Sequence, residues 1–185
     1  MQFDHVSFFK SVASSLSLLG HTEDKPAFFR ISGIAEMEEL LQNLGNAKLP
    51  ALLLEDELDG QYQDSGADYL ADVRNYMFYI IGKSEAQDMD KRGQVLNDCD
   101  IIRRQIIAFM LRKYRQDRSA NGNPTGLRNL LTSSFNYFTV GPLVDNFYGI
   151  AIGFQVMVAN NISYDADLWT FESGTENLSG YGETL

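Results

Sequence analysis

The chain has little of what disulfide-bonded, metal-binding or membrane-spanning proteins rely on. Among its 185 residues are one cysteine, Cys99, which excludes an intrachain disulfide, and two histidines, His5 and His21. No apolar run reaches the roughly 18 residues of a membrane helix, and the N-terminal segment lacks the basic start of a signal peptide. We therefore expect a soluble protein that needs neither a membrane nor an oxidising compartment.

Motifs of the common enzyme classes are also missing. The sequence has no GxGxxG, P-loop, GxSxG or CxxC motif. His5 and His21 have no neighbour at a metal-ligand spacing. Cys99 lies on the apolar face of an expected helix, which favours a buried thiol over a reactive one. We therefore expect no enzymatic activity, no cofactor and no metal.

The chain is acidic, with a net charge of −10, but the charge is uneven. Residues 1–72 carry thirteen acidic and four basic side chains, residues 73–123 carry six and ten, and residues 124–185 carry six and one. An acidic surface repels nucleic acid, so only the middle segment has the cations to contact phosphates. These cations dominate the C-terminal end of one expected helix, where they suit the helix dipole, and this favours a solvated face.

What the sequence does contain is enough apolar material for one core. Hydrophobic residues make up 44% of the chain. Helical spacing predicts helices over 3–19, 34–44 and 90–117, and apolar runs predict strands over 27–32, 49–54, 69–82, 133–140 and 147–160. This order predicts an α+β fold, with a mixed or antiparallel sheet and the long amphipathic helix packed on one face. Residues 1–170 are expected to form a single domain, and residues 171–185 a flexible polar tail.

The last expected strand has two different faces. Its bulky side chains alternate with Gly149, Ala151 and Gly153, which leave the opposite face almost smooth. A smooth face lets a helix or a neighbouring subunit approach closely, so these three residues are candidates for packing between subunits. Trp169, which follows the strand, is a further candidate for packing onto the domain or onto an adjacent subunit.

Residues 55–66 form an acidic, glycine-containing segment that we expect to be an exposed loop or a hairpin tip. Its candidate functional side chains are Glu55, Asp56, Glu57, Asp59 and Asp64. Carboxylates at spacings of two bind Ca²⁺ in some loops, but the twelve-residue calcium pattern is absent. This favours a solvated acidic loop.

The order of the elements, together with the segments LPALLLE (residues 49–55) and GIAIGF (residues 149–154), resembles the tail-terminator and head–tail completion proteins of bacteriophages. The stretch GFQVMVANNISYDADLW, residues 153–169, is similar to the last strand of such proteins. The resemblance covers residues 1–170. It implies a non-enzymatic virion protein of the tail or neck, made in the host cytoplasm, that forms a homo-oligomeric ring and contacts other tail or neck proteins. DNA would pass nearby without specific binding, and the five acidic side chains would line the channel or reach a neighbouring subunit.

Two other hypotheses stay open. One is a soluble protein-binding adaptor, which predicts a monomer or dimer with one apolar patch. The other is an enzyme whose site assembles from scattered residues such as His5, Asp72, Arg74 and Tyr76, which would need a concave pocket and shifted pKa values. The oligomeric state separates the virion-protein hypothesis, which predicts a ring, from the adaptor hypothesis, which predicts a monomer or dimer.

Overall fold

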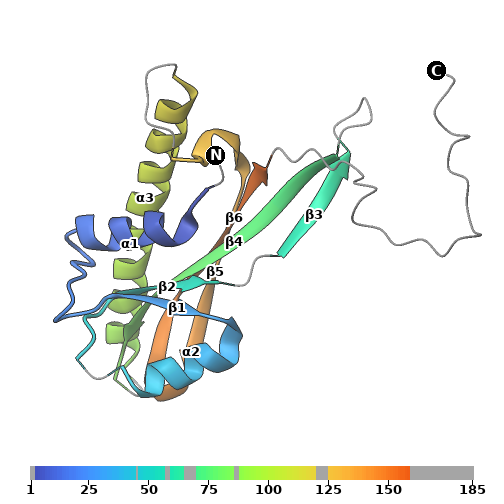
Figure 1. Ribbon diagram of the computed structural model, residues 1–185. Coiled ribbons are helices and arrows are strands. Elements are labelled where there is room, and N and C mark those ends of the chain that lie inside the picture. The colour runs from blue at the N-terminus through green and yellow to red at the C-terminus, as the bar shows by residue number, and fades with distance from the viewer. Residues whose placement is uncertain are drawn as a thin grey trace, which may run out of the picture.

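The computed structural model describes residues 3–44, 46–56, 59–64, 70–85, 88–119 and 125–158. Within these ranges three α-helices lie against one six-stranded mixed sheet (Figure 1). The fold is therefore α+β with a long helix packed on the sheet, which confirms the predicted class. Trp169 and the expected tail, residues 171–185, lie outside the described residues.

The sheet is built around its longest inner strand, β4 (Leu70–Lys83). β2 (Ala51–Glu55) and β6 (Phe147–Val158) flank β4 as antiparallel neighbours. β1 (Phe28–Ile31) runs parallel to β2 at one edge, and β5 (Leu130–Leu143) runs antiparallel to β6 at the other. β3 (Asp59–Asp64) pairs antiparallel with the first half of β4, so that the two strands form a hairpin.

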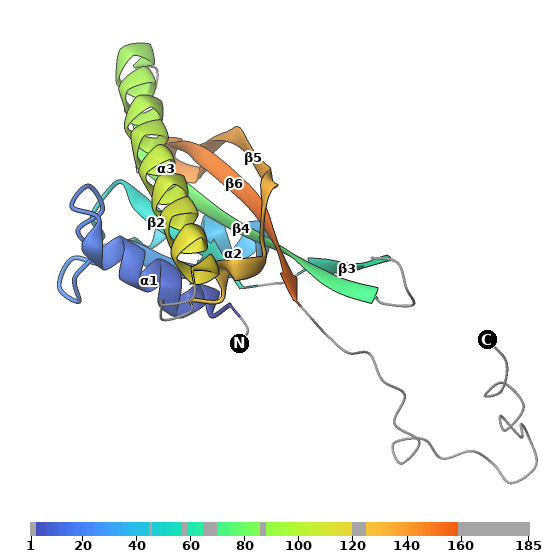
Figure 2. The same cartoon turned by 90° about the horizontal axis from the view of Figure 1, so that it is seen from above.

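Helices cover the two faces of the sheet unequally (Figures 1 and 2). α1 (His5–Ser15) and α3 (Met89–Arg118) pack on one face, whereas α2 (Gly33–Gln42) covers one end of the other. Two helices begin at an aspartate whose side chain accepts a backbone N–H three residues on. Asp4 accepts from Ser7 at 3.0 Å, and Asp88 accepts from Lys91 at 2.9 Å. These caps fix where α1 and α3 start.

Two hydrophobic cores lie on opposite faces of the sheet. The larger core, under α1 and α3, buries even-numbered residues of β4 and β6 such as Phe78 and Phe154. The smaller core, under α2, buries odd-numbered residues such as Tyr79 and Ala151. Successive strand residues point to opposite faces, so β4 and β6 contribute to both cores. This double burial explains why the second half of β4 is apolar without alternation.

Of the segment expected to be an exposed loop or a hairpin tip, the described residues are strands. Glu55 closes β2, and Asp59–Asp64 form β3, one strand of a hairpin with β4. The extended shape of β3 comes from backbone pairing with β4. Because this pairing does not depend on buried side chains, the sequence of β3 shows no alternation of apolar and polar residues. Two boundaries also shift. The first helix ends at Ser15 because Leu16 is extended, and Gly141 lies inside β5.

Gly149 of β6 marks a close approach of two backbones. A Cβ added there would collide with the carbonyl oxygen of Ile80 and lie 2.9 Å from the Cγ2 methyl of Ile81. We expect Gly149→Ala to lower the free energy of unfolding by about 1–3 kcal/mol, because β4 and β6 would have to separate. Urea unfolding measures the change.

Gly93→Ala in α3 is the matched control for this substitution. An added Cβ meets nothing within 4 Å there. Alanine should therefore raise the free energy of unfolding by about 0.5–1 kcal/mol, since glycine is unfavourable inside a helix. A Gly149→Ala protein as stable as the unsubstituted chain would show that the two strands do not approach this closely.

Candidate interaction surfaces

The acidic segment divides between two places. Glu55, at the end of β2, accepts a hydrogen bond from the Tyr79 hydroxyl at 3.2 Å, and Asp56 forms an ion pair with Arg30 at 2.7 Å. Burial, and after it the nearby Glu55 carboxylate, raises the pKa of Tyr79 to about 12, so the hydroxyl stays protonated and donates. These two carboxylates are therefore held by partners in their own chain.

The remaining acidic residues belong to the β3–β4 hairpin. Asp59 opens β3 opposite Asn75, and Asp64 closes it opposite Leu70. Glu57 lies outside the described residues. The hairpin extends away from the body that the helices form with the rest of the sheet (Figures 1 and 2). The expected contact with a channel or a neighbouring subunit therefore stays a prediction for Asp59 and Asp64, which mark the two ends of a projecting strand.

The smooth face of β6 is partly covered within the same chain. Ala151 is buried in the core under α2, and Gly149 lies against the backbone of β4. Gly153 is buried beside the side chain of Asn136, whose Oδ1 would lie 2.7 Å from an added Cβ. Both residues border an open depression of about 620 Å³ that extends from the start of α2 across β3, β4, β6 and β5. Among its lining residues, Gln155 donates a hydrogen bond to Asn75 at 2.8 Å. Helix α2 thus provides the close approach at Ala151, and packing between subunits stays a prediction for Gly153.

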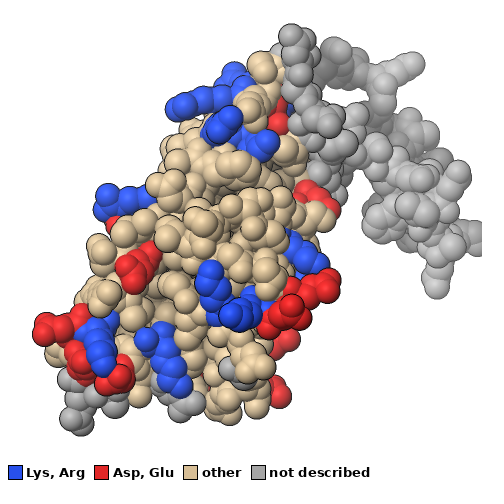
Figure 3. Space-filling model, turned by 90° about the vertical axis from the view of Figure 1, so that its left-hand side faces the viewer, with Lys and Arg blue, Asp and Glu red and all other residues tan. Residues whose placement is uncertain are grey.

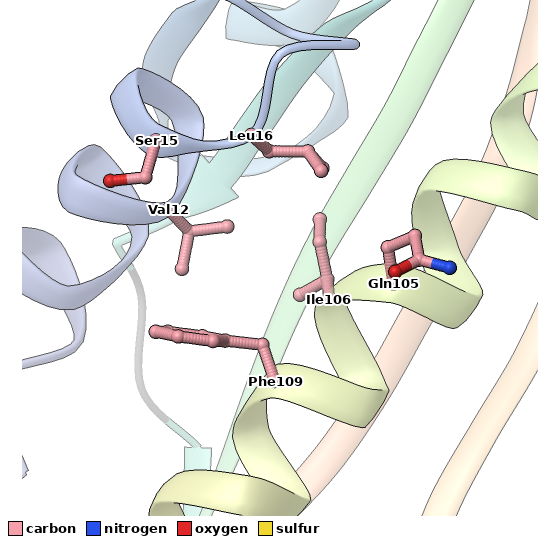
Figure 4. A pocket seen from close by; sticks show the side chains of 6 residues that line it. All are labelled: Val12, Ser15, Leu16, Gln105, Ile106 and Phe109. Atoms are coloured by element: carbon pink, nitrogen blue, oxygen red, sulfur yellow. The ribbon is translucent and has the colours of Figure 1, made fainter.

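A smaller hollow, of about 220 Å³, lies between α1 and α3 (Figure 4). Val12 and Leu16 project into it from α1 and its C-terminal end, and Ile106 and Phe109 project from α3. No charged side chain is among the described residues that line it. Phe109 is 37% exposed. This groove is the apolar patch that an adaptor would need.

Lysine and arginine lie at several places on the face shown in Figure 3, and one group of them lies at its upper end. This end coincides with the C-terminal part of α3, where Arg118 donates a hydrogen bond to the Tyr114 hydroxyl at 2.6 Å. Lys113 Nζ lies 5.4 Å from the centroid of the Phe109 ring. These cations contact side chains of their own helix, and most of the face beside them is uncharged in Figure 3. The arrangement agrees with the solvated face that the sequence favours.

The residues of the enzyme hypothesis lie near one another, with Tyr76 buried and the other three half-buried. The rings of His5 and Tyr76 have centroids 5.2 Å apart, and Asp72 forms an ion pair with Arg74 at 3.0 Å. Burial lowers the pKa of His5 and raises the pKa of Tyr76. Tyr76 is only 2% exposed, and among the described residues its buried hydroxyl has no hydrogen-bond partner. The shifted pKa values therefore reflect packing.

Cys99 and His21 also have packing roles. Cys99 is buried, and burial, with a smaller effect of Asp98, raises the pKa of the thiol to about 12. The reactive thiolate is then scarce at neutral pH. His21 Nδ1 accepts a hydrogen bond from the backbone N–H of Ala27 at 3.1 Å. Within the described ranges, no group of three or more His, Cys, Asp or Glu is placed to hold a metal ion.

The sequence analysis missed the sheet edges that β3 and β5 form, which are open in addition to the β1 edge. Among the described strands, β3 pairs only with β4 and β5 pairs only with β6. Tyr62 on β3 is 65% exposed, and Tyr137 and Phe138 on β5 are 59% and 51% exposed. A signal was present in the sequence, because residues 130–143 contain no charged side chain. Exposed edge strands usually carry charges that prevent pairing with another chain.

Comparisons with protein families, curated proteins and solved structures found no match to this chain. In the part of the chain that the structure describes, no helix has the length and apolar character needed to cross a membrane. The function must therefore be argued from the surfaces described above.

Proposed function

We propose that the chain is a non-enzymatic structural subunit that assembles with copies of itself into a ring, as a tail terminator or head–tail connector of a phage or phage-like particle. The projecting β3–β4 hairpin carries this proposal. Tyr62 and Leu70 are 65% and 44% exposed, and the register places them on one face of the hairpin as diagonal neighbours. Among the described strands β3 pairs only with β4, so its outer side is open, and contact with a neighbouring subunit would account for the exposed apolar side chains of the hairpin.

The charge of the chain supports a ring through which DNA passes. Each copy has a net charge of −10, and β3 begins and ends with an aspartate. Like charges repel, so an acidic lining lets DNA move through without being held. In this proposal the protein belongs to the tail or neck of the particle, and its other partners are the tail or neck proteins on either side of the ring.

Mass photometry and negative-stain microscopy of the full chain over a range of concentrations test the assembly. We expect closed rings. The double substitution Tyr62→Ser and Leu70→Ser should give folded monomers, because it removes both apolar side chains from the hairpin. Met89→Ser is the matched control, since Met89 is 70% exposed at the start of α3, away from the hairpin, and the ring should persist. Monomers of the unsubstituted chain at every concentration would contradict the proposal.

A protein-binding adaptor is the second candidate, and the apolar groove between α1 and α3 favours it. A groove between two helices that is lined by Val12, Leu16, Ile106 and Phe109 suits the apolar face of a partner helix. This candidate predicts a monomer or dimer across the same concentration range. The measurement of oligomeric state therefore distinguishes the two candidates.

A further inference from the structure

β5 is an open sheet edge that lacks the usual protection. None of its fourteen residues carries a charge. Its middle part, residues 136–140, pairs with β6 without interruption, and irregularities in the register lie on both sides of that part. Tyr137 and Phe138 occupy opposite faces there and are both more than half exposed. Charges, bulges and prolines normally prevent edge pairing, and the middle of β5 has none of these.

β3 is the second open edge, and it has a similar character. Its inner residues, 60–63, are uncharged, and its two aspartates stand at the ends. Because every copy carries a net charge of −10, two copies repel each other over most of their surfaces. The uncharged stretches of β3 and β5 are therefore places where two backbones can meet at low electrostatic cost.

The strand directions allow β3 of one copy to continue the sheet of another. β3, β4, β6 and β5 follow one another with antiparallel neighbours throughout. β3 and β5 consequently run in opposite directions at opposite edges. A β3 strand placed beside the β5 strand of another copy extends the antiparallel alternation without inverting the sheet. This contact joins two different edges, so repeating it generates a ring or a filament.

The faces of the two strands select a register. Tyr62 lies opposite Asp72, and Tyr137 lies opposite Ile152, which places both tyrosines on the α3 side of the sheet. Setting Tyr62 opposite Tyr137 aligns residues 59–63 with 140–136, the uninterrupted part of β5. The aromatic pair would then lie beside Arg103, whose guanidinium carbon is 3.8 Å from the centroid of the Tyr137 ring.

We infer that β3 of each copy pairs antiparallel with β5 of the next copy in this register, with Gln61 opposite Phe138. The inference rests on the proposed ring and specifies the contact that builds it. The occupant of the β5 edge is thus a second copy of this chain. The sheet becomes continuous from copy to copy, and the β3 and β5 edges are both paired, whereas β1 remains an edge strand beside β2. A two-fold pairing of β5 with β5 would leave β3 unpaired, which makes it the weaker solution.

A disulfide ladder tests the register in the full-length protein. Directly opposed residues of antiparallel strands have Cα atoms about 4.5–5.5 Å apart, within disulfide range. The double variant Gln61→Cys and Phe138→Cys should form covalent multimers on mild oxidation, seen on a non-reducing gel, while the buried Cys99 stays out of the reaction. β3 and β5 are at opposite edges, so a link within one copy does not arise. The pair Gln61→Cys and Thr132→Cys is the control out of register and should not cross-link.

A charge on the edge provides a second measurement. Phe138→Lys should weaken association by roughly 30-fold or more without a change in melting temperature, and Thr132→Lys on the same strand should not. Rings that form without a Gln61–Phe138 ladder, or that tolerate Phe138→Lys, would overturn the edge pairing and leave the proposed ring standing. Covalent dimers from Phe138→Cys alone would indicate β5 against β5 and would also overturn it. An unsubstituted chain that stays monomeric would overturn both proposals.

Discussion

Phe154→Ala should lower the free energy of unfolding by about 3–5 kcal/mol, the range for removing a fully buried Phe from a core. Phe154 is 1% exposed in the middle of β6. Its ring stacks on that of Tyr76 with 5.2 Å between centroids, and it lies within 6.3 Å of the rings of Phe3, Phe9, Phe78 and Phe135. The cavity would remove contacts to the N-terminal segment, α1, β4 and β5 at once, so little of the loss can be recovered by local collapse.

Urea unfolding followed by circular dichroism measures this loss, at a protein concentration low enough to keep the chain monomeric. Phe138→Ala on the neighbouring strand is the matched control. Phe138 is 51% exposed, so its removal should cost less than about 1 kcal/mol. In assembly the order of the two effects should be reversed. Phe138→Ala should weaken association between copies more than Phe154→Ala does, because Phe138 lies on the proposed contact edge. Similar losses of stability for both would mean that the aromatic cluster is not the centre of the core.

The long helix shows how much of the fold the sequence could predict. Helical spacing predicts residues 90–117, and α3 covers Met89–Arg118. Four of the apolar residues that set the spacing, Cys99, Ile102, Ile106 and Met110, are buried against the sheet, and Val95 and Tyr114 pack against this core partly buried. Sequence periodicity works here because one face of a helix meets one core along its length. The same reasoning locates β4, whose apolar second half reflects burial on both faces.

β3 could not be predicted in the same way. Its sequence, DGQYQD, contains one large apolar residue and no buried face, so hydrophobic spacing carries no information about it. The strand exists because β4 offers hydrogen-bond partners along its edge. Such pairing depends on the neighbouring strand and not on the side chains of the segment itself.

The candidate surfaces could also be predicted only where they depend on local sequence patterns and not on long-range packing. The alternation of β6 predicts two faces correctly, but only the tertiary arrangement shows that α2 covers Ala151 and leaves Gly153 at an open depression. Whether a strand lies at an edge also depends on long-range pairing. The sequence shows that residues 130–143 carry no charge. This lack of charge indicates a contact edge only because β5 pairs on one side alone among the described strands.

Asp117 is the buried carboxylate that connects the end of α3 to the start of β5. It is 7% exposed, and its two oxygens accept hydrogen bonds from the backbone N–H of Thr125 at 2.9 and 3.0 Å. Oδ2 also accepts from the Thr125 hydroxyl at 2.9 Å and from the backbone N–H of Leu127 at 3.0 Å. One side chain thus satisfies two backbone donors that precede β5.

Asp117→Ala should therefore lower the free energy of unfolding by about 3 kcal/mol, because it leaves these donors buried without an acceptor. Asp117→Asn should recover only part of the loss. Asparagine keeps one acceptor oxygen, but its NH₂ group replaces the other and cannot accept hydrogen bonds from the backbone N–H groups. Asp98→Ala, at an exposed position of the same helix, is the control and should change stability by less than about 0.5 kcal/mol. Urea unfolding of the three variants measures their free energies of unfolding, and the loss should be largest for Asp117→Ala and smallest for Asp98→Ala.

The consequence for assembly follows from where Asp117 acts. If the next copy pairs with β5, loosening the segment that starts β5 should weaken association in addition to folding, and hydrogen exchange should accelerate first at Thr125 and Leu127 and then along β5. Asp98→Ala should leave both exchange and association unchanged. A folded Asp117→Ala protein that assembles with unaltered affinity would show that the contact between copies does not depend on how β5 is held.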